Sequence, residues 1–118
     1  MKPNGPEGLL AKLKRSSEVT ITVRGRRSGR KFSAPVWFVV DGEKVILVPT
    51  KGSDNNWFKN LVKDPHIELD GILTPSEAKI VRDSGQVEKI LDAFRAKYRS
   101  MWSESYYTKR DVYVEVAV

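Results

Sequence analysis

Apolar and polar residues alternate in two stretches of the chain, and this two-residue period is typical of half-buried β-strands. Val19, Ile21 and Val23 set the pattern near the start, and residues 112–117 repeat it at the end. Runs rich in β-branched and aromatic residues indicate further extended segments between them. The predicted strands cover residues 19–24, 31–40, 44–49, 66–69, 72–81 and 112–117.

Turn residues separate these segments at short intervals. Asp41-Gly42 and Asp70-Gly71 each stand between apolar runs, which is a strong signal for a β-hairpin. Residues 25–29 contain two glycines and predict another turn. Pro35 lies inside a predicted strand and cannot donate to a neighbouring strand, so we expect it at an edge or a bulge.

Helical spacing appears in three places. Residues 8–15 and 57–63 predict short helices, and residues 84–99 predict a longer one that begins with a capping-box pattern at Asp83 and Gln86. Strands do not alternate one by one with helices, which argues against a parallel doubly wound sheet. We therefore predict a mainly β fold with helices (α+β), as a small antiparallel barrel. The chain is read as a single domain, 1–118, with an N-terminal extension or helix at 1–16.

The inventory of reactive residues excludes several kinds of chemistry. The 118 residues contain no cysteine and one histidine, His66, so thiolate and multi-histidine metal centres are excluded. No P-loop motif and no serine-nucleophile motif is present. No apolar run is long enough to span a membrane, and the first six residues do not resemble a signal peptide. We expect a cytoplasmic protein.

The charge distribution points to an anionic ligand. Lys and Arg number 21 against 15 acidic residues, giving a net charge of +6. No acidic residue occurs between Glu18 and Asp41, a stretch that includes Arg26 and Arg27 in the predicted turn. Lys51-Gly52 forms a second candidate anion-binding loop. Two such loops at strand ends predict a pocket for an anionic planar ligand, although a merely solvated hairpin fits the composition equally well.

Aromatic residues near these loops have two interpretations. Trp57 shares a predicted helix with other apolar residues and fits either the core or a ligand site. Trp102, Tyr106 and Tyr107 lie in an irregular segment before the last strand, where they fit a wall for a flat ligand or a small cluster under a loop.

An ordered series of short motifs resembles a known family. The series runs through Gly25-Arg26-Arg27-Ser28-Gly29, Pro35-Val36, Thr50-Lys51-Gly52 and Asn56-Trp57-Phe58-Lys59-Asn60-Leu61. It is similar to the deazaflavin-dependent nitroreductase family, within the pyridoxamine 5'-phosphate oxidase-like split β-barrels that bind FMN. The resemblance covers about residues 19 to 118. It implies a six-stranded antiparallel split barrel and, as cofactor, FMN or the deazaflavin coenzyme F420.

The resemblance also implies roles for individual residues. Those that match cofactor-binding positions are Arg26, Arg27, Lys31, Pro35, Val36, Lys51, Gly52 and Trp57. Phe32 stands where some members carry an arginine, and the adjacent Lys31 is the expected substitute. Some members place tyrosines over the substrate, and Tyr106 or Tyr107 is the candidate proton donor here.

The function that follows is hydride transfer between a flavin-type cofactor and a small electron-poor acceptor, such as an activated alkene, a quinone or a nitro compound. Two alternatives stay open on the sequence. One is a basic barrel that binds single-stranded nucleic acid, and the other is a non-catalytic protein that stores the cofactor. Among partners we expect a small-molecule substrate and a possible homodimer, but neither a membrane span nor nucleic acid.

Overall fold

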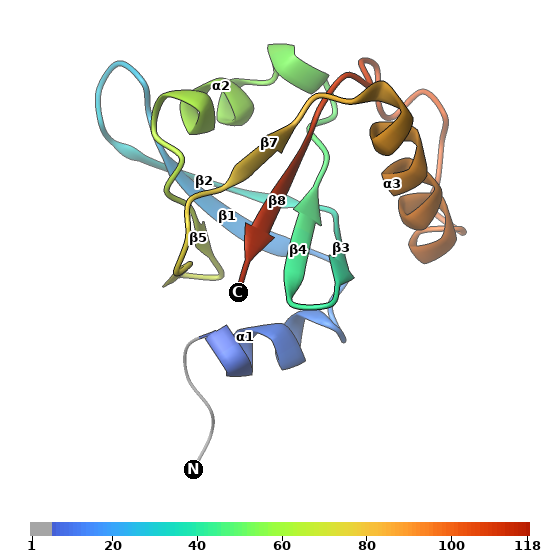
Figure 1. Cartoon of the computed structure of the whole chain (residues 1–118), viewed down its shortest axis with the longest axis horizontal. Helices are drawn as coiled ribbons and strands as arrows, with labels where there is room; N and C mark the ends of the chain where they lie inside the picture. The colour runs from blue at the N-terminus through green and yellow to red at the C-terminus, as the bar shows by residue number, and fades with distance from the viewer. Residues whose placement is uncertain (1–5) are drawn as a thin grey trace.

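Two four-stranded antiparallel sheets and three α-helices make up the computed structural model, which describes residues 6–118 (Figure 1). Residues 1–5, part of the predicted extension at 1–16, lie outside the described residues. The first sheet holds, in spatial order, β2 (Lys31–Val36), β1 (Val19–Arg24), β5 (Glu68–Leu69) and β6 (Ile72–Leu73). The second holds β3 (Phe38–Asp41), β4 (Lys44–Leu47), β8 (Tyr113–Ala117) and β7 (Lys79–Val81). The helices are α1 (Pro6–Leu13), α2 (Asn56–Lys63) and α3 (Ser84–Lys97), with a short 3₁₀ turn at Gly52–Asp54.

The mixed α+β class and the antiparallel sheets confirm the coarse prediction, but the number of strands differs. Eight strands are present where six were predicted, because the segments 31–40 and 72–81 each divide between the two sheets. The chain leaves the first sheet after Val36 and enters the second at Phe38. Across residues 6–118 no ladder joins the two sheets, so the predicted six-stranded count of the split barrel is not confirmed and no closed barrel is formed.

Hydrogen bonds from side chains stabilise both crossings, the two places where a predicted strand divides between the sheets, between β2 and β3 and between β6 and β7. The Tyr98 hydroxyl accepts from the Phe38 N–H at 2.9 Å. At the second crossing, the buried Thr74 hydroxyl donates toward the carbonyl oxygens of Ile67, at 3.2 Å, and Ser76, at 3.1 Å. A strand that changes sheets leaves backbone groups without ladder partners, and these side chains supply them.

Two hydrophobic cores lie on opposite faces of the second sheet. One fills the space between the sheets and includes Ile21, Leu47 and Val114. The other packs Ile46 and Val48 against α3. Because β4 is buried on both faces, its sequence is apolar at consecutive positions and shows no two-residue period.

The turns and the long helix follow the sequence signals. A hairpin joins Asp41 to Lys44, and a second turn follows Leu69, where Asp70 and Gly71 both take positive φ. Asp83 caps α3 by accepting a hydrogen bond from the Gln86 N–H at 3.0 Å. Pro35 lies in β2, an edge strand, as predicted.

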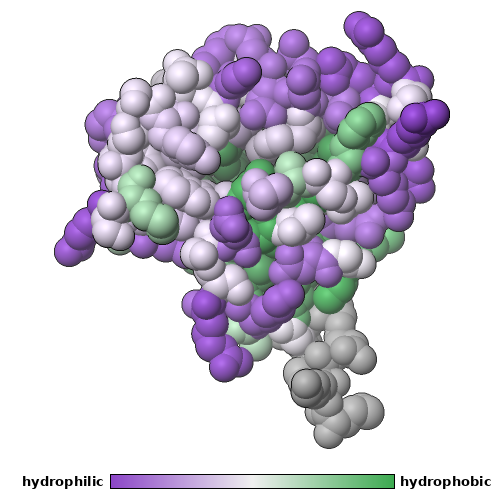
Figure 2. All heavy atoms as spheres, turned by 180° about the vertical axis from the view of Figure 1, so that it is seen from behind, coloured by the Kyte–Doolittle hydropathy of each residue, from purple (hydrophilic) through white to green (hydrophobic). Residues whose placement is uncertain are grey.

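The surface is mostly hydrophilic, and Figure 2 shows a face on which hydrophobic residues gather in a strip across the middle. The large apolar side chains that remain exposed are Phe32, Val62, Leu73, Met101 and Tyr106. Two of these, Phe32 and Tyr106, line the cavities of the candidate site. Among the helices of the described part, none is long and apolar enough to cross a bilayer.

Candidate functional site

Two adjoining cavities lie along β2, the free edge of the first sheet. The larger one, of about 530 Å³, lies between the β1–β2 hairpin and α2, and we call it the basic groove. Its lining residues are Gly25, Arg26, Arg27, Ser28, Phe32, Ala34, Asn55, Asn56, Trp57 and Asn60. The smaller one, of about 180 Å³, is the aromatic pocket. Its lining residues are Ala34, Pro35, Val36, Trp37, Val48, Thr50, Trp57, Tyr106 and Tyr107. Ala34 and Trp57 line both, so the two cavities are adjacent.

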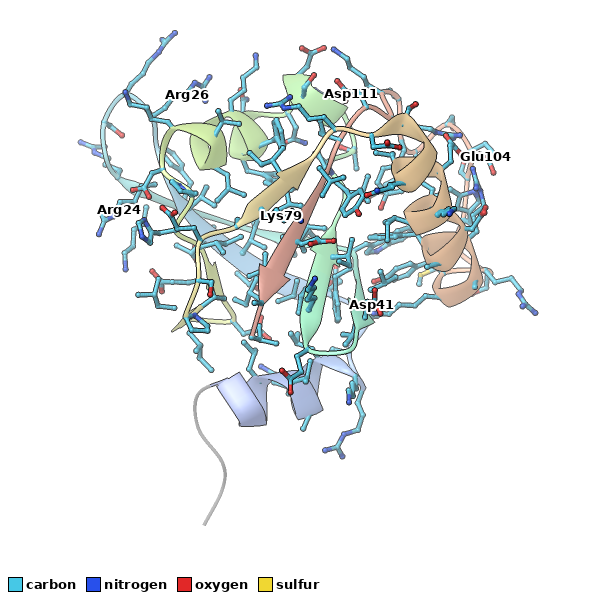
Figure 3. All side chains as sticks on the ribbon, viewed as in Figure 1. Arg24, Arg26, Asp41, Lys79, Glu104 and Asp111 are labelled. Atoms are coloured by element: carbon cyan, nitrogen blue, oxygen red, sulfur yellow. The ribbon has the colours of Figure 1, made fainter. Side chains whose placement is uncertain are left out.

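Arg26 is fixed in the basic groove by α2. Its backbone N–H and its Nη1 both donate to Asn60 Oδ1, at 3.1 Å and 2.7 Å, and Nη1 also lies 3.5 Å from the Asn56 carbonyl oxygen. Asn60 is only 7% exposed, so its amide is held in place by the surrounding helix and strand. Figure 3 shows Arg26 at this junction of the hairpin and α2. The guanidinium keeps further N–H donors for a ligand.

The positive charge of the basic groove is not neutralised by the protein. Within the described residues, no carboxylate lies within 4.0 Å of the guanidinium of Arg26 or Arg27. Arg27 is exposed at the tip of the hairpin. Uncompensated guanidinium groups beside a cavity favour an anionic ligand such as a phosphate or a carboxylate.

Glycine at position 25 allows the hairpin to close over Phe32. A Cβ at Gly25 would approach the Phe32 ring to 2.5 Å, so any side chain there would displace that ring. The Gly25 N–H donates to the Arg30 carbonyl at 2.7 Å and so closes the turn that carries Arg26 and Arg27. The predicted turn at 25–29 therefore has a packing reason as well as a conformational one.

The start of α2 sets the position of Trp57, whose ring lies where the two cavities meet. Asn55 caps the helix by accepting a hydrogen bond from the Trp57 N–H at 3.1 Å. Trp57 is half-buried and packs against the core between the sheets. It thus combines the two interpretations that the sequence left open.

Four aromatic rings surround the aromatic pocket. Trp37 stacks on Tyr106 with ring centres 4.8 Å apart, and Tyr106 meets Tyr107 edge to face at 5.1 Å. Tyr106 is 46% exposed, whereas Tyr107 is 3% exposed. Burial raises the pKa of the Tyr107 hydroxyl, which therefore stays protonated at physiological pH.

Three hydrogen-bond donors on residues that line this pocket have no acceptor within the described part of the chain. They are the indole N–H of Trp37 and the hydroxyls of Tyr106 and Tyr107. Over the same residues, no buried side-chain nitrogen or oxygen lacks a partner. The donors of Trp37 and Tyr107 are thus open to solvent, and Tyr106 is itself exposed. Together they can bind the oxygen atoms of a ligand.

The loop after β4 supports the aromatic pocket from outside. The Thr108 N–H donates to the Thr50 carbonyl at 2.8 Å, and the Ser53 N–H donates to Asp111 Oδ1 at 2.9 Å. Gly52 is buried at positive φ, and a Cβ there would overlap Asp111 Oδ1. Figure 3 places Asp111 beside the short 3₁₀ turn that contains Gly52. These contacts join residues 50–54 to the segment that carries the two tyrosines.

The structure brings most of the sequence-predicted residues together, but not all. Arg26, Arg27, Pro35, Val36, Trp57, Tyr106 and Tyr107 line the two cavities. Lys51 and Gly52 line neither. Lys31 lies at a different cavity and forms an ion pair with Glu68 at 2.8 Å. Neighbouring residues of a strand face opposite sides, so Lys31 does not replace Phe32 in the basic groove.

Asn60 and Trp37 are among the residues of the site that were not selected from the sequence. Asn60 is a buried polar residue on an apolar helix face. A polar residue at such a position indicates a specific hydrogen-bonding role, and the sequence alone could have shown this. Trp37 lies in the middle of an apolar run and gives no local signal, because only the crossing between the sheets brings it to the pocket.

Comparisons with known proteins agree with this geometry. The family model described as F420H(2)-dependent quinone reductase matches residues 1–118, the whole sequence, so the chain belongs to this family. It is therefore an oxidoreductase whose family uses the deazaflavin coenzyme. Of the two cofactors that the sequence predicted, FMN and the deazaflavin coenzyme, the family confirms the second. Membership of an enzyme family also favours the reductase over the storage and nucleic-acid alternatives. No curated protein matches the chain.

Solved structures show the same fold at low sequence identity. One described as an F420 reductase has 18% identity, covers 98% of this chain and 94% of its own, and has a TM-score of 0.68. A putative pyridoxamine 5'-phosphate oxidase from Listeria innocua has 13% identity, coverage of 95% and 91%, and a TM-score of 0.64. A third, described as a domain-swapped dimer, has 21% identity, coverage of 85% and 79%, and a TM-score of 0.64.

Proposed function

We propose that this chain reduces small planar acceptors of the quinone type with a hydride from the deazaflavin coenzyme. The observation that supports this most is that two unlike cavities are adjacent. A groove with two uncompensated arginines shares Ala34 and Trp57 with a pocket lined by aromatic residues that carry three free hydrogen-bond donors. One end suits an anionic tail, and the other suits a flat ring system with oxygen atoms.

The basic groove is assigned to the anionic part of the coenzyme. Arg27 and the free donors of Arg26 would hold phosphate or carboxylate oxygens, and Asn60 keeps Arg26 in position for them. The coenzyme, when bound, supplies a hydride that, with one proton, completes the two-electron reduction of a quinone to a hydroquinone. Strand β2, which lines both cavities, would lie along the ring system of the coenzyme.

The aromatic pocket is assigned to the acceptor. Negative charge develops on a quinone oxygen as the hydride arrives, and hydrogen-bond donors placed there stabilise that charge. Tyr107 acts as a neutral donor that orients the acceptor, because its raised pKa makes it a weaker acid. Tyr106 is exposed and exchanges protons with solvent, so it is the better candidate to deliver the proton.

Several finer parts of the sequence prediction belong to the same proposal. Activated alkenes and nitro compounds share the electron-poor character of quinones and would occupy the same pocket. The chain acts as one domain, 1–118, in the cytoplasm. A homodimer is supported by the neighbouring fold described as a domain-swapped dimer.

Titration of the purified protein with the deazaflavin coenzyme and, separately, with FMN tests the proposal. We expect the deazaflavin to bind more tightly, and turnover of naphthoquinone to require it. Arg27→Ala should weaken deazaflavin binding about tenfold or more, because charge-assisted hydrogen bonds contribute at least this much.

Arg15→Ala is the matched control, since Arg15 follows α1 and lines neither cavity. Equal losses in both variants would show that net charge, and not the basic groove, determines binding. Failure of the protein to bind either coenzyme would contradict the proposed function itself.

A further inference from the structure

The side chain of Trp37 belongs to a stack of three rings at the point where the chain crosses between the sheets. Its ring lies parallel to that of Tyr98, with centres 4.1 Å apart and an angle of 5° between the planes. Its other neighbour is Tyr106, at 4.8 Å and 25°. Trp37 therefore connects Tyr98, the buried tyrosine that caps the C-terminal end of α3, with the exposed tyrosine of the aromatic pocket.

The inner end of this stack is firmly held. Tyr98 is 1% exposed, and its hydroxyl accepts from the Phe38 N–H at 2.9 Å. The same hydroxyl lies 2.8 Å from the Ser17 carbonyl oxygen and 2.9 Å from the Phe38 carbonyl oxygen, to which it can donate. Lys97 Nζ donates to the Phe38 carbonyl at 2.9 Å. Both polar groups of the residue after Trp37 are thus bound by α3.

The outer end of the stack has little other support. The Tyr106 ring is 46% exposed, and within the described residues its hydroxyl has no hydrogen-bond partner. The backbone of the segment is held by the Tyr106 N–H, which donates to the Ser103 carbonyl at 3.0 Å, and by the Thr108 N–H, which donates to the Thr50 carbonyl at 2.8 Å, but neither bond orients the Tyr106 ring. The ring itself is placed by Trp37 and by its edge contact with Tyr107. Removing Trp37 would leave the Tyr106 ring without the flat surface that orients it.

We propose that Trp37 is a specificity-determining residue of the aromatic pocket. Clamped by Tyr98, its ring fixes Tyr106 and keeps the pocket narrow and flat, so that planar aromatic acceptors are preferred over puckered ones. Its indole N–H adds one donor to the pocket. This inference rests on the proposed function for the kind of acceptor, and the role of Trp37 can be measured separately.

The experiment compares two acceptors, naphthoquinone and cyclohexenone, of which only the first is fully planar. The measured quantity is the ratio of their kcat/KM values with the reduced deazaflavin coenzyme. Trp37→Leu removes the ring, whereas Trp37→Phe keeps a ring and removes only the indole N–H. Tyr98→Phe releases the Phe38 peptide but keeps the stack. Tyr113→Phe is its matched control, because that hydroxyl bonds to Gln86 and not to the crossing.

We expect Trp37→Leu to lower the ratio about tenfold or more, since a displacement of the reacting groups by about 1 Å can have effects of this size. Trp37→Phe should retain the ratio within about threefold, as the loss of a single hydrogen bond allows. The ratio for Tyr98→Phe should lie between the ratios of these two variants, and the ratio for Tyr113→Phe should equal that of the wild type. A Leu variant that keeps the wild-type ratio would overturn the inference. Tyr106→Leu, at an exposed position, must reproduce the loss if Trp37→Leu proves unstable.

Equilibrium dialysis of naphthoquinone against the coenzyme-free protein provides a readout without turnover. Weaker binding to Trp37→Leu, with unchanged binding to Tyr113→Phe, supports the role of Trp37 even if the coenzyme proves to be different. Equal binding to both variants counts against it. If the wild type does not bind the deazaflavin coenzyme, the proposed function is contradicted. The role of Trp37 in acceptor binding is then tested by the dialysis result alone.

Discussion

The two ends of the site are built in different ways. The basic groove comes mainly from one hairpin and one helix, where Arg26 contacts Asn60 directly. The aromatic pocket combines four separate parts of the chain, at residues 34–37, 48–50, 57 and 106–107. The first depends on local turns and a cap, whereas the second depends on how two sheets and a loop segment are joined. We therefore expect mutations to separate coenzyme affinity from acceptor turnover.

The largest effect is expected from Gly52→Ala, at the loop that supports the aromatic pocket. Gly52 has φ of +55°, and a Cβ would overlap Asp111 Oδ1 and lie 2.8 Å from the Lys109 carbonyl oxygen. We expect a loss of about 2–4 kcal/mol in the free energy of unfolding, measured in urea. Gly42→Ala is the control, because Gly42 has a similar φ of +61° and no atom near its Cβ position. Its loss should be about 1 kcal/mol, and equal losses would show that backbone strain alone is responsible.

Asn60→Leu should separate the two ends most clearly. The variant removes the oxygen that receives both Arg26 donors, at 3.1 Å and 2.7 Å, without changing the size of the side chain greatly. The dissociation constant of the deazaflavin coenzyme should rise about tenfold, while kcat with saturating coenzyme changes little. Asn60→Asp keeps an acceptor for Arg26 but adds a carboxylate that neutralises the guanidinium, so it should also weaken binding of the anionic coenzyme. A fall in kcat without weaker binding would contradict the division between the two ends.

Tyr107→Phe should show the reverse behaviour. The hydroxyl has no partner in the described residues, so its removal leaves the buried ring in place and deletes only a donor to the acceptor. We expect kcat/KM for naphthoquinone to fall about threefold to tenfold, with the coenzyme affinity unchanged. Steady-state kinetics together with coenzyme titration checks this. Unchanged turnover would remove Tyr107 from the acceptor site.

The smallest effect concerns pH and the segment that leads to Tyr106. Glu104 accepts hydrogen bonds from Arg95, Trp102 and Arg110, which lower its pKa from 4.5 to about 2. A carboxylate with a lowered pKa stabilises the fold above pH 4.5, and this contribution is lost as the pH falls toward 2. The wild type should therefore melt above Glu104→Gln at pH 6 and together with it near pH 2. A difference that persists at pH 2 would exclude this carboxylate as the cause.

Local signals predicted much of the fold. The alternation at 19–24, the hairpin at Asp41-Gly42 and the cap at Asp83 all lead to the elements observed. The two divided strands could not be predicted in this way. Phe38 continues an apolar run without any break, and its change of sheet depends on Tyr98, which lies sixty residues further along the chain. Residues that close a bend from such a distance leave no pattern near it.

The sequence by itself determined the basic hairpin and, through its resemblance to a known family, the class of protein and a cofactor that is either FMN or the deazaflavin coenzyme, because these depend on short motifs and on the charge of neighbouring residues. Only the tertiary structure decided that Asn60 holds Arg26, that Lys31 faces Glu68 instead of the groove, and that Trp37 enters a stack beside Tyr106. The physical reason is that a side chain's neighbours across a sheet or a crossing are set by strand register and packing. Spacing along the chain does not encode them.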